Sequence, residues 1–178
     1  MGLTETFKLD LYPEYTATFC LFDDVTNIST LRQKVMKKEI DCALINMDYV
    51  TGVFPVLLAC NKAVYAKTNK SMKTRSLHTE VLYNLSPSNS ITDSLKTFGA
   101  ADSQKAVLCL CLRKEEEGET GAQAIFNMVE GTAKALSCLE RFVNVEKCKN
   151  IYKITDGESD IGTLEDSIVM RISTKDVL

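Results

Sequence analysis

The sequence has 178 residues, 45% of them hydrophobic and 25% charged, which suffices for one well-filled core and excludes a disordered chain. Its net charge of −3 argues against a strongly basic, generic nucleic-acid binder. The longest apolar run, residues 53–60, is far shorter than the ~20 residues that span a bilayer, and the charged N-terminal residues are unlike a secretory signal. We therefore expect one soluble domain over residues 1–178 with no membrane partner.

Cysteine usage indicates a reducing compartment. The seven cysteines lie mostly among apolar neighbours, and an odd number in a chain of this size does not indicate a disulfide framework. We expect them to be reduced core residues of a protein of the cytoplasm and nucleus.

The first half of the chain predicts alternating strands and helices. β-branched and aromatic runs favour strands, and apolar residues spaced three or four apart favour helices. Pro55 is placed where the first turn of a helix tolerates it, and the helix that follows is apolar almost all round, as in a buried helix. The predicted elements are a strand over 16–22, a helix over 28–38, a strand over 42–45, and helices over 56–66 and 77–85.

The second half adds a central strand and a C-terminal helix. The continuous apolar run 106–112 is typical of a strand covered on both faces. Ser90 with Asp93, and Thr163 with Asp166, have the spacing of helix N-terminal caps. They predict helices over 91–98 and from 164 onwards, with another over 124–130. The fold class is therefore α/β of the mixed α+β kind, with a small central mixed sheet packed by several helices.

Charge is unevenly distributed along the chain. No acidic residue occurs between Asp48 and Glu80, whereas that segment holds several cations. Such a stretch can form a positive groove for the phosphates of single-stranded RNA. The alternative is that these lysines merely solvate a loop between helices. The cations are Lys62, Lys67, Lys70, Lys73 and Arg75.

Motifs for catalysis or cofactor binding are weak. The sequence has no phosphate-binding glycine loop, dinucleotide fingerprint or paired-histidine zinc motif, so we expect no cofactor, no metal and no small-molecule substrate. Its single histidine, His78, is expected to be an exposed helix residue. Cys109 and Cys111 should share one apolar strand face, and Asp23 with Asp24 favours a turn. A small cytosolic enzyme using Cys or Asp chemistry remains an alternative, as does a purely structural adaptor.

Several short runs resemble the TPRKB family, and the similarity covers nearly the whole chain with its spacing kept. The C-terminal runs resemble the vertebrate members closely. The runs are Asn61-Lys62-Ala63, Met72-Lys73-Thr74-Arg75-Ser76-Leu77 with Glu80, Asn84-Leu85-Ser86-Pro87, Leu95-Lys96-Thr97-Phe98-Gly99, Ile151-Tyr152-Lys153, Ile161-Gly162-Thr163-Leu164 and Ser173-Thr174-Lys175-Asp176-Val177-Leu178.

The resemblance implies a non-catalytic subunit of the KEOPS complex. Such a subunit binds the small atypical kinase/ATPase of that complex and supports threonylcarbamoyladenosine modification of tRNA, while other subunits carry the chemistry. The resemblance also implies that the subunit binds the 3′ single-stranded end of the tRNA.

The predicted RNA site combines that implication with the acid-free segment. We expect Asn61 to offer its amide to a base or sugar, and hydroxyls of Thr74 or Ser76 to add contacts. The cations predicted to neutralise phosphates are Lys62, Lys73 and Arg75. Lys62 lies in an otherwise apolar helix, so it must reach solvent or find a partner.

The predicted protein-binding site is the C-terminal helix, because its apolar stripe can pack into a partner groove. Leu164, Ile168 and Ile172 are the expected anchors, with Ile161 on the same stripe and Met170 on the opposite side. The alternative is that this stripe covers the protein's own core.

Overall fold

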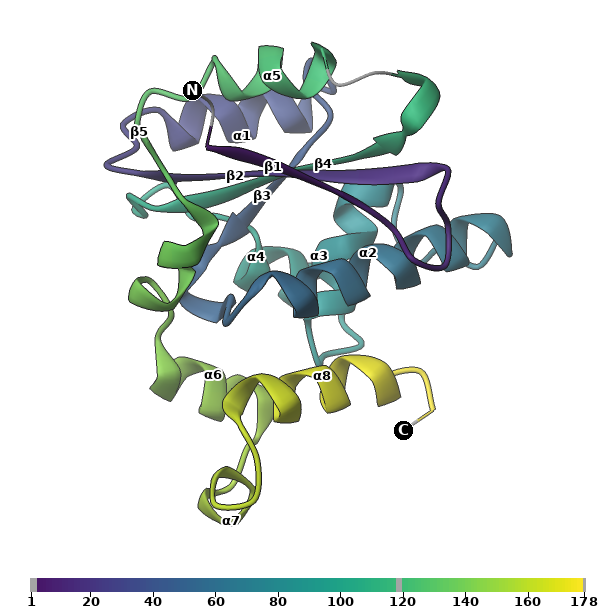
Figure 1. Cartoon of the computed structure of the whole chain (residues 1–178), viewed down its shortest axis with the longest axis vertical. Coiled ribbons are helices and arrows are strands. Elements are labelled where there is room, and N and C mark those ends of the chain that lie inside the picture. The colour runs from purple at the N-terminus through teal and green to yellow at the C-terminus, as the bar shows by residue number, and fades with distance from the viewer. Residues whose placement is uncertain (1–2, 118–119, 178) are drawn as a thin grey trace.

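An antiparallel β-sheet lies at the centre of the computed structural model, which describes residues 3–117 and 120–177 (Figure 1). The strand order is β1-β2-β4-β3, and β5 also pairs with β2. β1 pairs with β2 up to Cys20 and β5 continues along β2 from Leu21, so the two short strands share one edge of β2. The strands are β1 (Thr4–Lys8), β2 (Tyr15–Asp23), β3 (Ala43–Asn46), β4 (Val107–Lys114) and β5 (Thr132–Lys134).

Helices cover both faces of the sheet (Figure 1). On one face lie α1 (Ile28–Met36) and α5 (Thr120–Phe126); on the other lie α2 (Val53–Thr68), α3 (Leu77–Leu85) and α4 (Ile91–Phe98). Beyond α2 and α3 an outer layer holds α6 (Val145–Tyr152) and α8 (Leu164–Thr174), with the short α7 (Asp156–Ser159) between them in sequence. Single 3₁₀ segments span Met47–Tyr49, Glu115–Glu117 and Leu136–Arg141.

The apolar run of β4 explains its central position. Its odd-numbered residues from Val107 to Cys111 join the buried cluster beneath α1 and α5, and its even-numbered residues from Leu108 to Leu112 join the cluster beneath α2 and α3. Alternating side chains of a strand point to opposite faces, so a strand between two cores must be apolar throughout. The prediction of a central strand covered on both faces is confirmed.

Local capping signals fix where several helices begin. Thr163 accepts a hydrogen bond from the Asp166 amide at 3.1 Å, and Asp166 accepts one from the Thr163 amide at 3.0 Å, which forms the predicted capping box of α8. Ser90 likewise accepts a hydrogen bond from the Asp93 amide at the start of α4. Pro55 lies in the first turn of α2, as expected.

The mixed α+β class is confirmed, but the prediction of a mixed sheet is wrong, because every strand pairing among the described residues is antiparallel. β1, β5 and α6 were not predicted, since β1 and β5 are short strands at a sheet edge with no fully buried residue, and half of the residues of α6 are polar. Within the described ranges, no helix is both long enough and apolar enough to cross a membrane.

Candidate functional site

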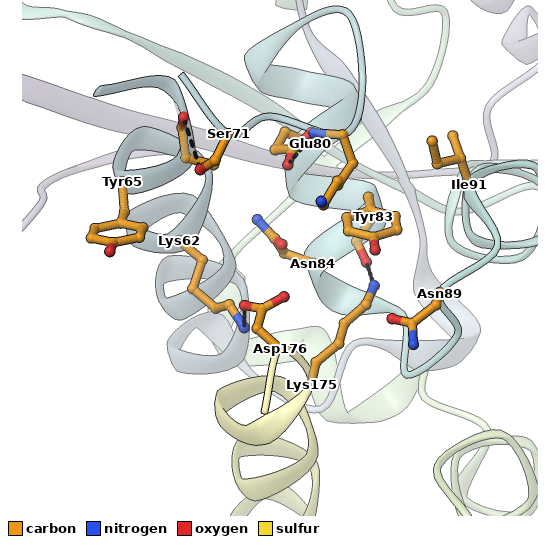
Figure 2. Close-up of a pocket in the computed structure, with 12 residues that line it drawn as sticks. Lys62, Tyr65, Ser71, Glu80, Tyr83, Asn84, Asn89, Ile91, Lys175 and Asp176 are labelled. Carbon is orange, nitrogen blue, oxygen red and sulfur yellow. Dashed lines mark hydrogen bonds and ion pairs between the residues drawn. The ribbon is translucent and has the colours of Figure 1, made fainter. Parts of the chain in front are cut away.

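A basin of about 670 Å³ opens between α2, α3 and the end of α8 (Figure 2). Its floor and rim combine cations, carboxylates and aromatic rings that come from segments far apart in the sequence. The polar and aromatic lining residues are Lys62, Tyr65, Ser71, Lys73, Glu80, Tyr83, Asn84, Asn89, Lys175 and Asp176.

A buried carboxylate organises the loop on one side of the basin. Glu80 is only 2% exposed. It accepts hydrogen bonds from the Lys73 amide at 3.1 Å, from the Thr74 amide at 2.8 Å and from the Thr74 hydroxyl at 2.6 Å. A buried charge is tolerated only when it is satisfied in this way. Glu80 therefore fixes the backbone that carries Lys73 at the basin.

The hydroxyl groups predicted to contact RNA, those of Thr74 and Ser76, form hydrogen bonds at the start of α3. The Ser76 hydroxyl accepts a hydrogen bond from the Thr79 amide as the helix N-cap, and the one proton of the Thr74 hydroxyl is donated to Glu80. Both residues are half-buried. Their first role is to hold the loop, and RNA contact by them stays a prediction.

Lys62 finds a partner within the chain instead of extending into solvent. Its Nζ donates to the Ile172 carbonyl at 2.7 Å and lies 2.9 Å from Oδ2 of Asp176, and its side chain is 18% exposed. A cation is favourable at the C-terminal end of a helix, where carbonyls lack partners. Lys62 thus ties α2 to the last turn of α8 at the edge of the basin (Figure 2).

Lys175 is a basin residue that the sequence analysis missed. It is 7% exposed, it donates to the Tyr83 carbonyl, and its Nζ lies 3.3 Å from the centroid of the Tyr83 ring. Burial lowers the pKa of Lys175 to about 8. The sequence signal for Lys175 as a site residue was its place in the C-terminal run that resembles the TPRKB family. No pattern in the neighbouring sequence linked Lys175 to Tyr83.

The cations of the segment without acidic residues, between Asp48 and Glu80, do not all lie on one surface. Lys62 and Lys73 line the basin, whereas Arg75 is exposed outside its lining. Lys67 lies 5.7 Å from the ring centroid of Tyr15, which is not a basin residue. The structure therefore brings together only part of the predicted cationic set.

Asn61 also lies outside the basin lining. Its Oδ1 accepts from the Leu11 amide at 3.4 Å and its Nδ2 donates to the Leu57 carbonyl at 3.0 Å. Both ends of the amide are engaged within the chain. The residue that offers a free flat surface at the basin is Tyr65, which is 59% exposed.

The expectation that His78 is exposed is wrong. The side chain is 4% exposed, its Nδ1 lies 2.7 Å from Oδ1 of Asp41, and its Nε2 accepts from the Leu112 amide at 2.9 Å. A backbone amide can only donate, so the ring proton is on Nδ1 and is donated to Asp41. That hydrogen bond lowers the pKa of Asp41. His78 ties α3 to β4 and is no free base.

The buried thiols are poor nucleophiles. Cys109 and Cys111 face the same core, as predicted, and burial raises the pKa of Cys111, as of Cys148, to about 12. Because the thiolate is the reactive form, such groups are inert. Asp24 is in a left-handed turn conformation with φ of 52° and donates its amide to Asp23, which confirms the turn. In the part of the chain that the structure describes, no three metal-ligating side chains gather.

The predicted protein-binding residues separate into core and surface. Ile168 and Ile172 are each 1% exposed and belong to the core cluster that includes α2, so they cannot anchor a partner as predicted. The amphipathic stripe covers the protein's own core because α8 packs on α2. Leu164 is half-buried, whereas Ile161 is 90% and Met170 58% exposed.

This separation predicts unequal effects on stability. We expect Ile168→Val to lower the free energy of unfolding by about 1 kcal/mol, since it removes a buried methyl group. Met170→Ala should change it by less than about 0.5 kcal/mol, since that side chain is largely in solvent. Urea denaturation of the two variants measures both values, and equal losses would contradict the assignment.

Comparison with known proteins agrees with the sequence motifs. A family model described as "Kinase binding protein CGI-121" matches residues 22–176. The chain is 40% identical over 172 residues to the EKC/KEOPS complex subunit TPRKB of Danio rerio, covering 97% of this chain and 98% of that protein. It is 25% identical over 166 residues to the EKC/KEOPS complex subunit CGI121 of Candida glabrata, covering 91% of each. The resemblance drawn from the short runs is confirmed.

Proposed function

The chain belongs to the CGI-121 family, and from that premise we propose that it is a non-catalytic subunit of the KEOPS complex, binding a small kinase-like partner and the 3′ single-stranded end of tRNA. In this role it supports threonylcarbamoyladenosine modification, and it works in the cytoplasm and nucleus. The chemistry is carried out by other subunits.

One observation supports the RNA part of the proposal: the basin places cations beside an exposed aromatic ring. Proteins hold single-stranded nucleic acid with positive groups along the backbone and aromatic rings that stack on bases. Lys73 is exposed at the basin, and Tyr65 presents its ring at the same opening. A terminal nucleotide can stack on Tyr65 while its phosphate contacts Lys73.

Arg75 extends the same positive surface beyond the basin. It follows Lys73 in the loop that Glu80 holds, and within the described ranges neither cation lies within 4 Å of a carboxylate. Exposed cations without a counter-ion are free to neutralise phosphates. We assign Lys73 and Arg75 to successive phosphates of the strand that enters the basin.

For the protein partner, we propose contact through the exposed residues beside and on α8. Ile161 and Met170 are apolar and in solvent, which is the arrangement expected of residues that a partner covers. Leu164 lies between them in sequence and is half-buried. Met170→Ala, whose stability should be unchanged, is the variant in which a loss of kinase binding can be measured cleanly.

The double substitution Lys73→Ala with Arg75→Ala tests the RNA part. We expect it to weaken binding of whole tRNA about tenfold and to lower the slope of log affinity against log salt by about 1.4, because two phosphate contacts are removed. Fluorescence anisotropy of labelled tRNA across a salt series gives both quantities.

A matched control removes two positive charges on the other side of the sheet. Lys34→Ala, in α1, with Lys37→Ala, at the C-cap of α1, changes the net charge equally and should leave affinity within about twofold. Whole tRNA should also bind more tightly than tRNA that lacks its 3′ single-stranded end. Equal weakening by both double variants, or no preference for the intact end, would sink the proposed RNA site.

A purely structural adaptor is favoured by one observation: Asn61 and Lys62 already have partners within the chain. That alternative predicts no direct binding of tRNA by the purified subunit, so the same titration separates it from our proposal.

A further inference from the structure

We infer that the end of α8 is an autoinhibitory latch, in which the Asp176 carboxylate occupies the place on Lys62 that an RNA phosphate would take. The latch consists of Lys175 and Asp176. This inference rests on the proposed RNA-binding function and concerns the regulation of the same basin.

The donors of Lys62 show why the two anions compete. The Lys62 ammonium group donates a hydrogen bond to the Ile172 carbonyl at 2.7 Å, and the Asp176 carboxylate forms an ion pair with the same group at 2.9 Å. The side chain is only 18% exposed, so little of it can be approached from solvent. A phosphate can bind Lys62 strongly only by displacing the Asp176 carboxylate.

The Asp176 carboxylate can be replaced on Lys62 by another anion. Its side chain is 61% exposed, so it stays hydrated while it pairs with Lys62 (Figure 2). Ion pairs at such exposure contribute little to stability and are weakened by competing ions. The Ile172 carbonyl, by contrast, belongs to α8 itself and stays with Lys62 when Asp176 leaves.

Within the latch, Lys175 is the residue that anchors this turn to the domain, and it covers the ring of Tyr83 in the basin. Its ammonium lies 3.3 Å from the Tyr83 centroid and donates to the Tyr83 carbonyl, while Tyr83 is 5% exposed. Burial lowers the pKa of Lys175, because the charged ammonium group loses hydration in this position. Release of this turn would return Lys175 to water and uncover Tyr83 as a second ring for stacking, beside Tyr65.

Asp176→Asn tests the latch with little change of shape. It keeps a polar side chain but removes the charge that competes with phosphate, and we expect it to tighten binding of tRNA about fivefold at low salt, with the gain shrinking as salt rises. Asp160→Asn is the matched control, because it removes the same charge from an exposed position outside the basin. Anisotropy titrations of the full chain measure all three affinities.

The outcomes separate the latch from the function on which it rests. If wild type binds tRNA and Asp176→Asn binds no more tightly than Asp160→Asn, the latch is overturned and the proposed function stands. If none of the three proteins binds tRNA, the proposed function fails and the latch fails with it. Thermal denaturation of Asp176→Asn should match that of wild type within a few degrees, which confirms that a tighter complex does not reflect a changed fold.

Discussion

Replacement of His78 by alanine is expected to lower the free energy of unfolding by about 3 kcal/mol, which exceeds the loss expected for any of the other variants. The change leaves the buried amide of Leu112 without its acceptor and opens a cavity between α3 and β4. For a chain of this length, such a loss lowers the melting temperature by about 10 °C. Calorimetry and urea denaturation give the two values independently.

Asp41→Asn is the control for the other side of the His78 ring. Asp41 is 75% exposed, and asparagine keeps an oxygen that can accept from Nδ1, so we expect a loss below about 1 kcal/mol. The Asp41 pKa is lowered in the fold, so the pair stabilises the protein above the ordinary value of 3.8, and this stabilisation is lost as pH falls through the folded pKa. Similar losses in His78→Ala and Asp41→Asn would contradict the importance of the Leu112 contact.

Glu80→Ala is expected to lower the free energy of unfolding by about 2 kcal/mol and to release the loop that carries Lys73. The variant removes the acceptor of two amides and one hydroxyl, although water entering from the basin can satisfy part of them. Hydrogen exchange gives the local result: the amides of Lys73 and Thr74 should exchange faster, while amides of β4 should keep most of their protection.

Glu80→Gln separates the positioning role of this residue from its charge. Glutamine removes the negative charge but keeps an oxygen that Thr74 can reach, so the loop should stay ordered and the loss of stability should be about 1 kcal/mol. Since both variants lack the charge, we expect Glu80→Ala to bind tRNA about fivefold more weakly than Glu80→Gln. Identical affinities would show that Glu80 does not position Lys73.

Local signals predicted the parts of the fold that depend on neighbours in sequence. The caps at Ser90 and Thr163 and the apolar run of β4 each lie within one element, and the structure confirms them. β1 and β5 were missed because a short strand at a sheet edge needs only one neighbour and little apolar surface. Their pairing with β2 is decided by tertiary contacts.

The candidate site was only partly predictable for the same reason. Lys62 and Lys73 came from the acid-free segment, but Lys175 reaches Tyr83 across 92 positions of sequence. The environment of His78 likewise depends on Asp41, 37 positions away, and on Leu112, 34 positions away. A helical pattern can assign a residue to the polar side of a helix, but it cannot show which element that side meets.

The contacts at the two ends of the α2 and α8 pair determine how these helices align. A side chain at Gly52, the N-cap of α2, would have its Cβ 3.2 Å from the carboxyl carbon of Glu165, in the first turn of α8, and Lys62 meets the last turn of α8 through Ile172. The helices therefore run side by side in the same direction, an arrangement that their dipoles disfavour. Glu165 at the positive end of α2 and Lys62 at the negative end of α8 offset that repulsion. Sliding α8 by one turn, about 5.4 Å, would move Glu165 away from the positive end of α2 and the negative end of α8 away from Lys62. The attraction between unlike charges at both places therefore fixes the register of the C-terminal helix.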